Sequence, residues 1–337
     1  GKALGSFLGA PAQDLVFVDN ATTGVSTVLS NLDLIAGDRI LVTDHGYNAC
    51  SNAARYFTKR ASAEIDLINL PFPGSDANEF IEKILGACTS RTRLLLIDHI
   101  TSPTALIMPL EEIVPAVQQR GIQVLVDGAH APGILPLRLA ELGADYYTGN
   151  CHKWMCAPKG TAFLYVKPEH QSNLHPLTIS HGMNRPVGDS TRFRLEFDWI
   201  GTRDLTGFLT LPALIEYMGG ISNEGWAGIM ARNRALALEA RDLICQELGL
   251  ESPCPVDMIG SLATVCLPVP KKATFTDYHV VDPLKEILRH NHGIEVSLSA
   301  WPSPAGRYLR VSAQLYNSLV HYQQLTKALQ VELGRGH

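Results

Sequence analysis

Short runs of apolar residues alternate with amphipathic stretches along the first two-thirds of the chain. Several runs are continuously apolar, which is typical of strands buried on both faces of a sheet. The runs predict strands at residues 15–18, 39–43, 64–70, 93–97, 123–126, 145–148 and 161–166. Helical spacing between them predicts helices at residues 24–35, 48–59, 76–87 and 110–120. Such alternation favours an α/β fold with a mostly parallel central sheet flanked by helices.

The pattern changes after Gly219 and Gly220. A long helix is predicted at residues 226–248, closed by Gly249. Further elements follow as a strand at 261–267, a helix at 283–290, strands at 294–298 and 308–312, and a helix at 317–333. This is the pattern of a smaller α+β unit. We therefore predict a large domain at residues 1–220 and a small C-terminal domain at residues 221–337.

Composition narrows the classes of function. Hydrophobic residues make up 46% of the 337 residues and charged residues 18%, which is typical of a globular protein. The net charge of −5 provides no basic field for binding nucleic acid or an anionic membrane. No apolar run reaches the roughly 18 residues that a membrane-spanning helix needs. We therefore expect small-molecule chemistry, with neither nucleic acid nor membrane as a partner.

The seven cysteines form no Cys-x-x-Cys pair and show no zinc-binding spacing, so no metal site is predicted. An odd number of cysteines in a chain of this length is typical of reduced thiols inside cells. The sequence therefore predicts a cytoplasmic protein.

Two polar motifs follow predicted strands. Asp127 comes directly after an apolar run, at the strand end where open α/β sheets place their ligands. Lys153 lies in a turn beyond the next predicted strand. Either residue alone has an ordinary explanation, a structural carboxylate or a solvated loop charge. Together they fit pyridoxal 5′-phosphate, which needs a lysine amine for its Schiff base and an acid beside its pyridine nitrogen.

A phosphate also needs hydrogen-bond donors, and a helix N-terminus supplies them. The sequence Asn-Ala-Thr-Thr-Gly at residues 20–24 follows a predicted strand and opens a helix. Thr22 and Thr23 are candidates both for helix capping and for phosphate binding, and the two roles are compatible.

These motifs resemble the class V aminotransferase group of fold-type I pyridoxal-phosphate enzymes. The resemblance rests on the order Asn-Ala-Thr-Thr at 20–23, Asp-Gly-Ala-His-Ala-Pro-Gly at 127–133, His-Lys-Trp at 152–154 and Arg-Val-Ser at 310–312. Three further motifs resemble the isopenicillin N epimerase-like branch, a relative of cysteine desulfurases and cysteine C–S lyases: Asp-His-Gly-Tyr-Asn-Ala at 44–49, Thr-Ser-Pro-Thr-Ala-Leu at 101–106 and Asp-Trp-Ile-Gly-Thr-Arg-Asp at 198–204.

The resemblance implies a role for each matching residue. Lys153 would carry the cofactor and move the Cα proton, Asp127 would pair with the pyridinium, and His130 would lie near the phenolic oxygen. The residues implied near the phosphate are Ala21, Thr22, Asn150 and His152, with Thr202 reaching the phosphate of a neighbouring subunit.

Other implied roles concern the ring and the substrate. Tyr47, with His45 as the alternative, is expected to stack on the cofactor ring, and Ser102 is expected to contact the cofactor. Arg310 is the candidate clamp for the substrate α-carboxylate, and His181 is a candidate substrate contact. The tryptophans at 154, 199 and 301 could line the pocket, and Arg203 and Asp204 are expected to pair with each other.

The resemblance implies chemistry through a Cα carbanion, with epimerisation favoured. The alternatives are C–S lysis, formation of a C–C or C–N bond, and a non-catalytic scaffold that keeps the fold. Persulfide chemistry is disfavoured, because residues 297–306 contain no cysteine where desulfurases carry their nucleophile. The resemblance also implies a homodimer with shared active sites and an N-terminal segment before Gly1 that helps close them.

Overall fold

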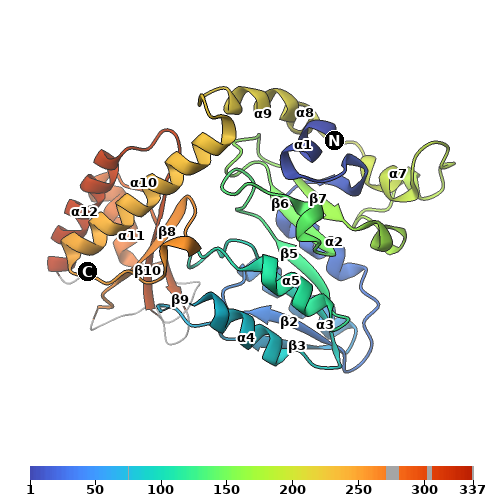
Figure 1. Cartoon of the computed structure of the whole chain (residues 1–337), viewed down its shortest axis with the longest axis horizontal. Coiled ribbons are helices and arrows are strands. Elements are labelled where there is room, and N and C mark those ends of the chain that lie inside the picture. Colours follow the sequence, from blue (N-terminus) through green and yellow to red (C-terminus); the bar gives the residue numbers. More distant parts are fainter. Residues whose placement is uncertain (75, 271–280, 302–305, 336–337) are drawn as a thin grey trace.

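The computed structural model describes residues 1–74, 76–270, 281–301 and 306–335. Its centre is a seven-stranded sheet with the order β1-β7-β6-β5-β4-β2-β3 (Figure 1). Strands β6, β5, β4, β2 and β3 are parallel, whereas β7 is antiparallel to both of its neighbours. The predicted mostly parallel sheet is therefore confirmed. The strands are β1 Leu15–Val18, β2 Arg39–Thr43, β3 Glu64–Ile68, β4 Thr92–Asp98, β5 Gln123–Asp127, β6 Tyr146–Asn150 and β7 Ala162–Val166.

Helices cover both faces of this sheet, because successive side chains of a strand point to opposite faces. On one face Val28 of α2 and Ala54 of α3 belong to a buried cluster with Leu125 of β5. On the other face Phe80 of α4 shares a buried cluster with Val124. The α-helices described up to Gly219 are α1 Lys2–Leu8, α2 Ala21–Ser30, α3 Asn48–Arg60, α4 Ala77–Ala87, α5 Leu110–Gln118, α6 Leu139–Leu142, α7 Arg192–Asp198, α8 Thr206–Leu209 and α9 Leu211–Gly219.

A second, antiparallel sheet has the order β8-β10-β9. The long helix α10 leads to it from α9 and packs against β8 and α12 (Figure 1). Arg307 of β10 forms a buried bidentate ion pair with Asp282, the N-cap of α11, at 2.6 and 2.7 Å. The elements are α10 Gly225–Leu248, β8 Leu262–Leu267, α11 Pro283–His292, β9 Ser297–Trp301, β10 Gly306–Ser312 and α12 Leu319–Gly334.

Most predicted strands end within one or two residues of the observed ends, and two of the differences have a clear structural reason. The strand predicted at 64–70 ends at Ile68, because the Leu70 N–H donates to the Asp44 carboxylate at 3.0 Å instead of continuing the sheet. The strand predicted at 294–298 begins only at Ser297. Its first residue, Ile294, instead donates its N–H to the Leu288 carbonyl at 3.0 Å and closes α11.

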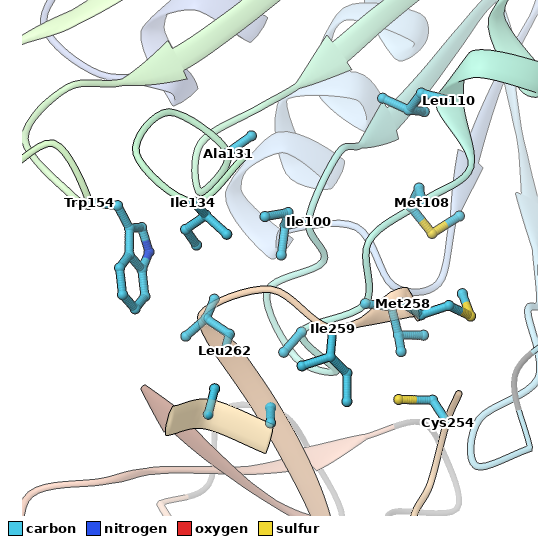
Figure 2. Packing of buried hydrophobic residues seen from close by; sticks show 14 of the residues in the cluster. Ile100, Met108, Leu110, Ala131, Ile134, Trp154, Cys254, Met258, Ile259 and Leu262 are labelled. Carbon is cyan, nitrogen blue, oxygen red and sulfur yellow. The ribbon is translucent and has the colours of Figure 1, made fainter. Parts of the chain in front are cut away.

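Apolar packing joins the two sheets close to the C-terminal ends of β4, β5 and β6. The segment after β4 runs along the segment that precedes β8, with a bridge between Leu106 and Ile259 and an Ile107 N–H to Met258 carbonyl bond of 2.9 Å. Figure 2 shows Ile100 and Trp154 facing this contact. The turns at the strand ends therefore lie beside the second sheet.

The seven-stranded sheet lies entirely within residues 15–166 and the three-stranded sheet within 262–312. The predicted domain boundary at 220/221 lies between these two ranges. The division into two domains stays a prediction. Among the helices described, none is long and apolar enough to cross a membrane.

Candidate active site

Three neighbouring strands end in polar residues at one edge of the large sheet. Asp98 ends β4, Asp127 ends β5, and Asn150 ends β6. Asp98 lies opposite Asp127 in the register of β4 and β5, and the β5–β6 pairing runs as far as Asp127 and Thr148. Because the C-terminal ends of parallel strands share an edge, this is where an open α/β sheet binds its ligand.

Lys153 lies in the turn that follows β6, with its Nζ 3.2 Å from Nε2 of His130. The Trp154 indole donates to Nδ1 of the same imidazole at 3.4 Å. Because an indole N–H can only donate, Nδ1 is the acceptor and a neutral His130 carries its proton on Nε2. That proton points at Nζ of Lys153, an arrangement that the neutral form of the lysine can accept.

The electrostatic surroundings agree with this arrangement. Although the Lys153 side chain has solvent access, the protein around it removes water from the ammonium and lowers its pKa, while Asp127 raises the pKa and Arg310 lowers it. Burial, followed by the charges of Lys153 and Arg310, lowers the pKa of His130 well below its ordinary value. Both groups are therefore biased toward their neutral forms, as a lysine nucleophile requires.

Asp127 is only 2% exposed, and both carboxylate oxygens have protein donors. The Ala129 N–H donates to Oδ1 at 3.0 Å, and the Cys50 thiol donates to Oδ2 at 3.0 Å. These two bonds fix the orientation of the carboxylate at the strand end.

The N-terminus of α2 lies at the same edge, joined to it by a bond from the Ala21 N–H to Asn150 Oδ1 of 2.8 Å. The helix begins at Ala21, three residues before the predicted start, because Asn20 caps it by accepting the Thr23 N–H at 2.8 Å. The cap is therefore Asn20 rather than Thr22 or Thr23. Thr22 remains half-buried on the first turn.

His152 follows Asn150 and adjoins Lys153. Its Nδ1 lies 2.9 Å from the Thr161 carbonyl oxygen, and a carbonyl only accepts, so Nδ1 carries a proton and Nε2 is left for another contact. Burial lowers the pKa of this imidazole, the Thr161 bond raises it, and the Lys153 charge lowers it.

Two loops from other elements border the site. Tyr47 is the N-cap residue of α3 and is 39% exposed, so its ring is available for contact with a ligand. Arg310 of β10 donates through Nη1 to the Ser102 carbonyl, and the same nitrogen lies 3.5 Å from the Ser102 hydroxyl. The structure thus brings Arg310 and Ser102 together, although 208 residues separate them.

His45 lies in the core, which corrects its assignment as an alternative stacking or catalytic residue. The side chain is 0% exposed, with Nδ1 2.7 Å from the Thr104 hydroxyl and Nε2 3.3 Å from the Leu70 carbonyl. Its ring packs 4.3 Å from that of Trp301, centroid to centroid. Burial, only partly opposed by the Leu70 bond, lowers its pKa to about 4, so His45 is a neutral packing residue.

The three tryptophans, His181 and Thr202 lie in different environments. Trp154 contacts His130 at the site, whereas Trp301 is a core residue and Trp199 is 44% exposed. His181 and Thr202 are exposed on the segment between β7 and α9, and no contact of either with Lys153 is described.

The predicted pair of Arg203 and Asp204 is wrong. Arg203 donates instead to Asp19 at 2.7 Å. Asp204 accepts instead from the backbone N–H and the hydroxyl of Thr206.

Two residues of the site were missed by sequence reasoning. Asp98 has the same signal as Asp127, a carboxylate at the end of an apolar strand. Cys50 gives no signal of its own, because its contact with Asp127 spans 77 residues.

Comparisons with known proteins agree with this geometry. The chain is 31% identical over 347 residues to isopenicillin N epimerase from Streptomyces clavuligerus, covering 99% of this chain and 83% of that protein. It is 30% identical over 339 residues to a probable chloroplastic L-cysteine desulfhydrase from Arabidopsis thaliana, covering 94% and 70%. Its fold is similar to that of the apo cysteine desulfurase from Thermococcus onnurineus NA1, with a TM-score of 0.79, 21% identity, and coverage of 100% and 83%. The family model of class V aminotransferases matches residues 2–324, and the chain therefore belongs to the class V aminotransferase family.

Proposed function

We propose that this protein is a pyridoxal-phosphate enzyme that removes the Cα proton of an amino acid and returns it to give the epimer. The observation that carries this proposal is the pairing of Lys153 with a neutral His130 at the sheet edge where Asp127 is buried. When bound, the cofactor draws in the electron pair that is left on Cα.

The donor set at this edge fits that cofactor. Asp127 would hold the pyridine nitrogen, since it is the buried, oriented carboxylate of the site. The first turn of α2, including Ala21 and Thr22, would bind the phosphate together with Asn150 and His152. Tyr47 would cover one face of the ring, and Ser102 and His130 would contact its edge.

Lys153 is the group that moves the proton. A neutral amine can take a proton from Cα, and the lowered pKa of Lys153 favours that neutral form. Arg310 would hold the substrate α-carboxylate through a bidentate pair and so orient the Cα–H bond toward the lysine. Return of a solvent-derived proton to the opposite side of Cα inverts the centre, and the proton on Lys153 passes to solvent.

C–S lysis is the second candidate, and the similarity to the L-cysteine desulfhydrase favours it. It begins with the same proton removal by Lys153 and diverges only when a β-substituent leaves. A bond-forming reaction would share these residues as well. Part of the segment that aligns with the desulfurase nucleophile, residues 302–305, lies outside the described residues.

A deuterium experiment separates the two candidates. The holoenzyme is incubated with candidate amino acids in deuterated water, and the products are analysed by NMR and mass spectrometry. Epimerisation predicts one solvent deuteron at Cα, an intact carbon skeleton and appearance of the opposite enantiomer. Release of a 2-oxo acid, ammonia and a thiol would replace the epimerase proposal by the lyase one. A scaffold would give neither result with any amino acid.

We also propose that the protein forms a homodimer in which Thr202 contributes to the partner's site. Large apolar side chains are exposed on the segment that carries Thr202 and on α8 and α9, which a partner subunit would bury. They are Leu177, Ile179, Met183, Val187, Trp199, Leu209 and Tyr217. A cytoplasmic location also stays a prediction.

Sedimentation velocity tests the dimer. We expect a species of twice the chain mass at micromolar concentration, and a shift toward the monomer when Leu209→Lys and Tyr217→Lys are combined. Tyr316→Lys and Val320→Lys, at exposed apolar positions in the C-terminal part, serve as the matched control and should leave the dimer intact. A monomer at all concentrations would contradict the proposal.

A further inference from the structure

Two buried carboxylates lie side by side beneath the proposed cofactor site. Asp98 and Asp127 face each other in register on neighbouring parallel strands, at 5% and 2% exposure. Paired residues on adjacent parallel strands point to the same face of the sheet, so the two carboxylates are neighbours, and two negative charges held close together away from water repel each other. A proton on either carboxylate would relieve this repulsion, and the proposed cofactor site needs the negative charge on Asp127 to pair with the pyridinium.

Cys50 contacts one member of this pair. It lies on the first turn of α3, is 2% exposed, and donates its thiol hydrogen to Asp127 Oδ2 at 3.0 Å. Burial and then the Asp127 charge raise the pKa of Cys50, so the thiol stays protonated and remains a donor. A hydrogen bond donated to a carboxylate favours its charged form.

We propose that Cys50 is a positioning residue for Asp127, whose thiol keeps the negative charge on Asp127 rather than on Asp98 and fixes the Oδ2 orientation. This inference rests on the proposed role of Asp127. Since Tyr47 is the N-cap of the helix that carries Cys50, the same bond also ties the proposed ring-stacking residue to the carboxylate at the ring nitrogen.

The other charges around the pair agree with this division. Burial, and next the Asp127 charge, raise the pKa of Asp98 well above its ordinary value, while the N–H groups of Tyr47 and Ser102 and the Lys153 charge oppose the rise. Tyr147, whose pKa is raised by burial and by Asp127, is neutral and adds no charge. His130, at the same edge, is neutral as well.

Substitutions at Cys50 distinguish this role from simple packing. Cys50→Val keeps a small apolar side chain, although it is larger than cysteine, and removes the donor. We expect the dissociation constant of pyridoxal phosphate from the apo-protein to rise about tenfold, the effect of one lost bond to a charged group. Cys50→Ser keeps a donor and should stay within about threefold of the native value. A packing role predicts the reverse order, because a buried site accepts valine better than serine. Cys254→Val and Cys254→Ser, at another buried cysteine, are the matched controls.

A second substitution tests the competition between the carboxylates. Asp98→Asn removes the rival charge, so Asp127 should stay ionised without help from Cys50. We therefore expect Asp98→Asn to restore most of the cofactor affinity that Cys50→Val loses. Additive losses in the double variant would overturn the proposed division of charge.

The hydrogen bond itself is measured without the cofactor. In the infrared spectrum of the apo-protein, we expect one S–H stretching band at lower frequency than the others, absent in Cys50→Val and moved toward the others in Asp127→Asn. If no band behaves in this way, the inference fails even for an active enzyme. If the band is present but the protein binds no pyridoxal phosphate, the proposed function fails while the bond to Asp127 stands, and the inferred role falls with that function.

Discussion

Lys153→Ala is expected to abolish turnover, with a loss of about 10³-fold or more, because it removes both the amine that carries the cofactor and the base that takes the Cα proton. The purified native protein should be yellow. Borohydride should fix the cofactor irreversibly to one tryptic peptide, the one that contains Lys153. The variant should lose both the covalent label and the visible band of the lysine-linked form.

Lys159→Ala provides the matched control, since Lys159 is an exposed lysine near the end of the same turn. It should keep colour, labelling and turnover. Labelling of a peptide other than that of Lys153, or full activity of Lys153→Ala, would refute the proposed function. A colourless native protein that turns over no amino acid would leave the scaffold explanation.

Arg310→Met should raise KM for the amino acid about 100-fold, with a smaller effect on kcat. The guanidinium is the group expected to pair with the α-carboxylate, and a hydrogen-bonded pair with a charged group contributes about 1.5–3 kcal/mol. Because Arg310 also donates to the Ser102 carbonyl, part of the loss could come from a displaced loop.

An amine that lacks the carboxylate separates these two causes. Native protein and Arg310→Met should bind such an amine equally well if the carboxylate is what Arg310 recognises. A displaced Ser102 loop would weaken both ligands alike. Arg289→Met, at a largely exposed arginine of α11, should change neither. An unchanged KM in Arg310→Met would exclude the clamp.

The parts of the site that the sequence predicted are those with a local signal. Asp127 follows an apolar strand and Lys153 follows the next, so parallel pairing was enough to place both at one edge. Asp98 has the same local signal, yet it went unnoticed because the strand was expected to stop at Ile97 and the carboxylate had no evident partner.

Long-range contacts account for the errors. His45 and Tyr47 are two residues apart, but His45 is turned into the core against Phe80 and Trp301, which no local pattern reveals. The helices α7, α8 and α9 were not predicted. Each has only a few turns and buries few side chains, so its sequence shows no long amphipathic pattern. The Cys50 bond was hidden for a related reason, since an apolar-looking helix position gives no indication of a carboxylate 77 residues away.

The apolar contact between the loop after β4 and the segment before β8 has a mechanical consequence. Lys153 follows a strand of one sheet and Arg310 lies on a strand of the other, so the spacing between proton acceptor and carboxylate anchor depends on packing side chains such as Ile100, Ile259 and Leu262. Movement of one sheet relative to the other would expose these apolar side chains to water. The cost of that exposure opposes a large hinge motion. The distance between Arg310 and Lys153 is therefore held constant. Selectivity among amino acids must come from contacts with the substrate side chain.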